Sequence, residues 1–92
     1  MVAPANPDTP TLVNHIRRTG VIPTRVAQSI RGGLASDDPQ QVADAASLFR
    51  ALHKADDALV KGWGAQRLKL ANAVMDGIDG GLSPKRAVEP AR

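Results

Sequence analysis

With 92 residues, the chain is long enough for one small domain and no more. It contains no cysteine, which excludes disulfides, thiolate metal sites and cysteine nucleophiles, and its aromatic residues are limited to one Phe and one Trp. The net charge of +3 divides into +3 over residues 1–35, −3 over residues 36–60 and +3 over residues 61–92, a mild and segmented excess that gives only weak support for nucleic-acid binding.

The N-terminal segment shows no targeting signal. It lacks the basic start and apolar centre of a signal peptide, and no apolar run in the chain approaches the roughly 20 residues of a transmembrane helix. Residues 1–8 hold two prolines and no periodic pattern, so we expect a flexible N-terminal arm there and a single helical domain over residues 9–90. These features favour a protein of the cytoplasm or of a virion.

Two short helices are predicted in the first third of the chain. Thr9 is a suitable N-cap before Pro10, and Gly20 is expected to end the first helix after about ten residues. The second helix is expected to begin at Pro23. Gly32-Gly33 is expected to end it in the left-handed conformation, with Leu34 packing back after the stop.

The clearest helix start is Asp37-Asp38-Pro39. Asp38 can accept hydrogen bonds from the free N–H groups of the first turn, and Pro39 lacks the N–H that would go unused. No Gly or Pro follows until Gly62, and apolar residues recur at helical spacing, which predicts a helix of roughly 20 residues.

The last third of the chain predicts a helix from about Ala65 to about Asp79 and a short final helix that Ser83 caps and Pro90 stops. Gly77 within the fourth helix suggests a frayed end or a close helix contact. No segment alternates with a period of two, so we predict an all-α fold, a small bundle of four helices plus a short C-terminal helix. We expect roughly antiparallel neighbours around a central third helix. The expected core is Leu12, Ile16, Val26, Ile30, Leu48, Phe49, Leu52, Leu59, Leu68, Ala71, Met75, Ile78 and Leu82.

No catalytic, metal or cofactor-binding residues are assigned. His15 and His53 are the only imidazoles, and a site would need the fold to join them and add a third ligand. Adjacent helical residues point about 100° apart, so Asp56 and Asp57 would not share one proton or ion on a regular helix. We therefore predict that the chain is not an enzyme.

Two kinds of interaction residue are considered instead. One side of the first two helices is rich in arginine and is a possible nucleic-acid contact, although a solvated basic face is the simpler interpretation: Arg17, Arg18, Arg25 and Arg31. Trp63 lies between two glycines, where it is either a buried plug at a helix corner, the favoured interpretation, or an exposed contact for a partner.

Three segments in this order resemble helical parts of the large internal virion proteins, or ejection proteins, of short-tailed bacteriophages. They are GVIP leading into VAQSIR at residues 20–31, GLASDDPQQVADAASL at residues 33–48, and GLSPKRAV at residues 81–88. Those proteins are long and mostly α-helical and leave the capsid with the DNA, whereas this chain has 92 residues and matches no transglycosylase motif. The resemblance implies an excised domain with a structural role in a virion or in DNA delivery.

We therefore expect a non-enzymatic structural or protein–protein interaction module that binds a protein partner or itself. The alternative is a small DNA-binding protein that uses the basic face of its first two helices.

Overall fold

The computed structural model describes residues 9–92, which form an all-α domain. No strand occurs in these residues, which confirms the predicted fold class, while the predicted arm over residues 1–8 lies outside the described part of the chain. None of the helices in residues 9–92 is long and apolar enough to cross a membrane. The elements are α1 (Thr9–Thr19), α2 (Thr24–Leu34), α3 (Pro39–Ala55), the 3₁₀ turn η2 (Asp57–Val60), α4 (Ala65–Asp79) and α5 (Pro84–Ala91).

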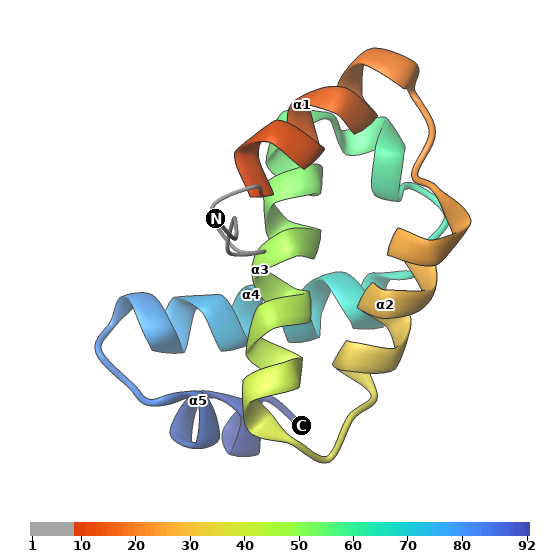
Figure 1. Ribbon diagram of the computed structural model, residues 1–92. Coiled ribbons are helices and arrows are strands. Elements are labelled where there is room, and N and C mark those ends of the chain that lie inside the picture. The colour runs from red at the N-terminus through yellow and green to blue at the C-terminus, as the bar shows by residue number, and fades with distance from the viewer. Residues whose placement is uncertain (1–8) are drawn as a thin grey trace, which may run out of the picture.

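The third helix is the central element, as predicted. α1, α2, α4 and α5 all contact α3, and α5 also packs along α4 (Figure 1). α2 runs antiparallel to α3 after the short connection between them, whereas α4 crosses α3 steeply. The prediction of roughly antiparallel neighbours is therefore right for α2 with α3 and wrong for α4 with α3.

The core forms where the other helices meet α3. Of the residues predicted to be in the core, five are buried: Ile16, Ile30, Phe49, Leu52 and Ala71. Seven more are half-buried against that cluster: Leu12, Val26, Leu48, Leu59, Leu68, Met75 and Ile78. The buried set also contains residues that the predicted core left out, among them Val13, Val60, Val74, Ala87 and Val88.

The predicted caps start the third and fifth helices. Asp38 Oδ1 accepts a hydrogen bond from the N–H of Gln40 at 3.0 Å, with Pro39 as the first helical residue. Ser83 Oγ accepts one from the N–H of Arg86 at 3.4 Å, again just before a proline. α5 then includes Pro90 and ends at Ala91, one residue beyond the predicted stop.

Loss of the first of these caps should be measurable. We expect Asp38→Ala to lower the free energy of unfolding by about 1 kcal/mol, because the N–H of Gln40 loses its acceptor. Asp37→Ala is the matched control, since it removes the neighbouring charge while the hydrogen bond from Gln40 to Asp38 is kept. Urea unfolding followed by circular dichroism compares the two variants. Equal losses would show that charge at the helix end matters more than the capping bond.

The third helix is shorter than predicted because Asp56 starts a new turn. α3 ends at Ala55, and Asp56 is extended, with φ −165° and ψ 113°. Its Oδ1 accepts a hydrogen bond from the N–H of Ala58 at 3.0 Å and so caps η2. An aspartate side chain competes with the helix for backbone donors in this way. α3 has 17 residues where roughly 20 were predicted, and the expected continuation of the helix through Leu59 is wrong because Asp56 and Asp57 belong to a cap and a turn.

Gly33 lies at a close contact between helices, not at a helix end. α2 continues through Gly32 and Gly33 to Leu34, so the predicted stop is wrong, and neither glycine has a positive φ. A Cβ added at Gly33 would lie 2.6 Å from the Cβ of Ala45 on α3. Gly33 therefore lets α2 approach α3 more closely than any side chain would allow.

A second close contact and a tight corner join α4 to α5. A Cβ added at Gly77 would lie 3.0 Å from the Cβ of Ala87, which confirms the predicted close helix contact. Gly81 has φ +101°, and the N–H of Leu82 donates to the carbonyl of Gly77 at 2.9 Å, which closes the end of α4.

The prediction that Leu82 belongs to the core is wrong, since this residue is 43% exposed. The reason is that Ala87 of α5 occupies the space beside Gly77, so that the Leu82 side chain reaches the edge of this contact but is not covered by it.

Candidate functional site

The main candidate for a binding site is a hollow between three parts of the chain, which we call the basic groove. Its volume is about 690 Å³, and it lies between the end of α2, the first half of α4 and the last residues of the chain. Four cationic side chains line the groove: Arg31, Arg67, Lys69 and Arg92. None of the described residues that line it is acidic.

The fold brings these cations together from distant positions in the sequence. Arg31 lies in the last turn of α2, and Arg67 and Lys69 lie in the first turns of α4, which contacts α2. α5 folds back along α4 and ends next to the corner between α2 and α3, and this places Arg92 at the groove.

Trp63 links the groove to the core. It is only 8% exposed, and its ring centroid lies 5.2 Å from that of Phe49. The guanidinium carbon of Arg31, Cζ, lies 4.7 Å from the centroid of the Trp63 ring, a distance typical of a cation–π contact. The buried alternative for Trp63 is therefore the one that the structure shows, with Arg31 covering it.

Two further arginines of the groove are held by main-chain carbonyls. Arg67 Nη1 donates a hydrogen bond to the carbonyl of Trp63 at 3.1 Å. Arg92 Nη2 donates to the carbonyl of Leu34 at 3.4 Å and to that of Ser36. The bond to Leu34 satisfies a carbonyl at the C-terminal end of α2, where helical carbonyls lack intrahelical partners. Together the bonds hold both guanidinium groups against the main chain.

Between the cations, most lining residues of the groove are apolar, and Gln66 is the exception among the described residues. Leu34 is buried and Leu70 is half-buried, and the other lining residues that carry no charge are Ala35, Gln66, Ala73, Pro90 and Ala91. The groove thus combines positive charge with a hydrophobic floor, which is the combination expected of a surface that binds an amphipathic ligand.

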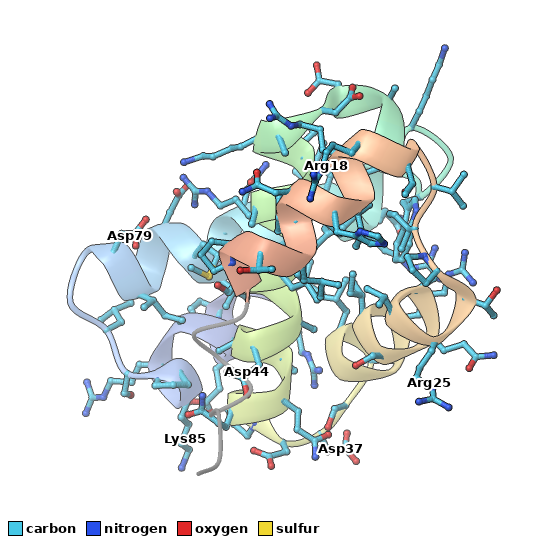
Figure 2. The ribbon with its side chains drawn as sticks, turned by 45° about the horizontal axis from the view of Figure 1, so that its top comes forward. Arg18, Arg25, Asp37, Asp44, Asp79 and Lys85 are labelled. Carbon is cyan, nitrogen blue, oxygen red and sulfur yellow. The ribbon has the colours of Figure 1, made fainter. Side chains whose placement is uncertain are left out.

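The arginines singled out from the sequence do not share one surface. Arg31 lines the basic groove, whereas Arg17 and Arg18 are exposed on α1, which contributes no residue to the groove. Arg25 is exposed in the first turn of α2. Figure 2 shows Arg18 and Arg25 on different helices and well apart.

The two histidines lie in different environments. His15 is exposed on α1, and His53 is half-buried on α3 with its Nε2 3.1 Å from Asp57 Oδ1. This contact joins the last turn of α3 to the first residue of η2. Residues 9–92 contain no group of three or more His, Cys, Asp or Glu side chains arranged to hold a metal ion.

Other carboxylates take part in structural contacts. Arg50 Nη1 of α3 lies 2.9 Å from Asp76 Oδ1 and 3.9 Å from Asp79 Oδ2, both on α4. Both aspartates are largely exposed, so these pairs should contribute little to stability. Arg50, Asp76 and Asp79 do not line the basic groove.

Comparisons with protein-family models, curated proteins and solved structures find no match to this chain. Sequence reasoning had identified one groove cation, Arg31, and missed Arg67, Lys69 and Arg92. The net charge of +3 over residues 61–92 was the only available signal for those three.

Proposed function

We propose that this chain is a non-enzymatic protein-interaction module and that the basic groove is its binding face. The observation that carries the proposal is the groove itself, with four cations around an apolar floor and no acidic residue among the described lining residues. Cations held over an apolar surface suit recognition of a partner, because charge complementarity gives specificity and burial of the floor gives affinity.

DNA binding through the first two helices is less well supported. It relied on a common face for Arg17, Arg18, Arg25 and Arg31, and these residues occupy separate surfaces. A DNA complex would weaken steeply with salt, because phosphate contacts release counterions. Absence of binding to duplex DNA at about 50 mM salt would remove this alternative.

The resemblance to ejection proteins supports a more specific version of the proposal. In that version the chain is a structural domain of an internal virion protein, and its partner is another virion protein or a second copy of itself. The corner at residues 81–88 and the segment at residues 33–48, on which the resemblance depends, build the helix starts at Asp38 and Ser83.

A displayed library of random peptides, selected on the immobilised whole chain, tests the general proposal. We expect the selection to enrich peptides that bind with about micromolar affinity, as is usual for short segments on shallow surfaces. In ¹H–¹⁵N spectra these peptides should shift the amides of Lys69, Leu70 and Ala91 more than those of α1. If no peptide is enriched, or if the shifts lie on other faces, the basic groove is not a protein-binding face.

A further inference from the structure

We propose that the partner of the basic groove is an acidic amphipathic segment of a protein, with carboxylates that pair with the groove cations and an apolar side chain that packs on Leu70 and Ala73. This inference rests on the proposed function and adds the chemistry of the partner. The argument depends on charge, on the fixed direction of the guanidinium groups, on the floor, and on the residues that flank the groove.

The charge of the groove is not neutralised within the described residues. The ion pairs of residues 9–92 join Arg50 to Asp76 and Asp79, and neither these pairs nor the contact of His53 with Asp57 involves a groove cation. The like charges around the groove repel each other, and an anionic ligand bound there would be attracted by all of them at once. Carboxylates from a partner would supply the missing negative charge.

The arginines are already positioned to receive carboxylates. Arg31 stacks on Trp63, and Arg67 donates to the carbonyl of the same residue, so both guanidinium groups are anchored at one place. A guanidinium has five N–H donors, and a single hydrogen bond or a stacking contact leaves most of them available for a planar carboxylate. Because these side chains are held before binding, less conformational entropy is lost when the partner arrives.

The floor of the groove favours a peptide over a nucleic-acid backbone. Leu70 and Ala73 present apolar atoms between the cations. A phosphate backbone has no apolar group to cover them, and among the described lining residues there is no exposed aromatic ring on which a base would stack. An amphipathic peptide covers the floor with a Leu or similar side chain and brings its acids to the rim.

The flanking charges give the partner a direction. Ser36, whose carbonyl accepts a hydrogen bond from Arg92, is followed in the sequence by Asp37 and Asp38, so carboxylates lie close along the chain to the Arg92 end of the groove. At the other side, α4 begins without a side-chain cap and without an acid in its first turn, which leaves its positive end unopposed. The acids of the partner should therefore lie near Arg31, Arg67 and Lys69.

The test uses the whole chain and a synthetic amphipathic peptide with Glu along one helical face and Leu along the other. Fluorescence anisotropy should show binding that weakens as salt is added. A peptide with Gln in place of Glu should bind at least about tenfold more weakly, and so should a peptide with Ser in place of Leu, since each removes one half of the recognition. Equal binding by either control peptide would overturn the inference.

Lys69→Glu is the decisive variant, because Lys69 is exposed and its side chain forms no hydrogen bond or ion pair within residues 9–92, so the fold should be kept. We expect this variant to bind the acidic peptide about three- to tenfold more weakly than the original chain does. Lys85→Glu makes the same change of charge at an exposed position on α5 that does not line the groove, and it should leave affinity nearly unchanged (Figure 2). Equal weakening by both variants would show that only net charge matters and would overturn the inference.

Two outcomes separate this inference from the general proposal. If the library yields groove-binding peptides that lack acids, the protein-interaction function stands and the acidic partner is wrong. If a single-stranded oligonucleotide of equal charge displaces the peptide and binds the chain more tightly, the groove serves nucleic acid and both proposals fail.

Discussion

Replacing Phe49 by Ala is expected to lower the free energy of unfolding by about 3–5 kcal/mol. Phe49 is fully buried in the middle of α3 and lies against Trp63, with the ring centroids 5.2 Å apart. Its removal leaves a cavity at the point where the central helix meets the corner before α4. A 92-residue domain has only about 5–14 kcal/mol in total at the usual stability per residue, so the loss is a large share of the whole.

Thermal unfolding followed by circular dichroism measures this effect, with a fall in Tm of more than about 10 °C expected for a domain of this size. Leu48→Ala is the matched control, since Leu48 precedes Phe49 on the same helix but is only half-buried. We expect this variant to lose clearly less stability than Phe49→Ala does. Trp63 is the only tryptophan, so its emission reports the same site and should shift to longer wavelength in Phe49→Ala. A loss no larger than that of Leu48→Ala would contradict the central position of Phe49.

Gly33→Ala should destabilise the domain by about 1–3 kcal/mol, although alanine is the better helix former. The new Cβ would lie 2.6 Å from the Cβ of Ala45 and 3.1 Å from the carbonyl oxygen of Gln41, and neither neighbour is the flexible end of a long side chain. α2 would have to move away from α3. Packing therefore predicts a lower free energy of unfolding for this variant, whereas helix propensity alone would predict a higher one.

Gly32→Ala provides the control on the adjacent residue. Gly32 is in the same helix and exposed, and a Cβ there would meet no atom within 4 Å. Propensity alone then acts, and the variant should gain up to about 1 kcal/mol of stability. Urea unfolding of the two variants should give shifts of opposite sign. Shifts of the same sign would show that the approach of α2 to α3 is looser than the Gly33 contact indicates.

Features that depend on neighbouring residues were predicted correctly from the sequence. Asp38 with Pro39, and Ser83 with Pro84, carry their capping chemistry within four residues, and Gly20 ends α1 with φ +77°, as expected. The all-α fold follows from such signals together with the apolar periodicity.

Features that depend on contacts across the fold were not predictable in the same way. Gly32-Gly33 is a sequence typical of a helix end. In the fold, Gly33 instead lies inside α2, where it faces Ala45 of α3 at a close contact. Asp56 is a different case, because the end of α3 is decided locally: its side chain accepts a hydrogen bond from the N–H of Ala58, two residues further on. The apolar spacing through Leu59 allowed the helix to continue, and the competing cap was overlooked.

The candidate site was the least predictable part of the molecule. Arg31 and Arg92 are remote in sequence, and they meet at the groove only because α4 crosses α3 steeply and α5 returns along α4. A prediction of antiparallel neighbours would not have placed Arg92 near α2. Arg67 and Lys69, two residues apart on one helix, gave no sign on their own of facing an apolar floor.

The anchoring of Arg92 has a practical consequence for handling this protein. Its guanidinium is bound to the carbonyls of Leu34 and Ser36, so anything attached after residue 92 emerges at the mouth of the basic groove. An affinity tag fused there would compete with a ligand, and an acidic tag most strongly. A small environment-sensitive dye at the same position would instead become a direct optical sensor of occupancy, whereas purification handles belong ahead of α1, which contributes nothing to the groove.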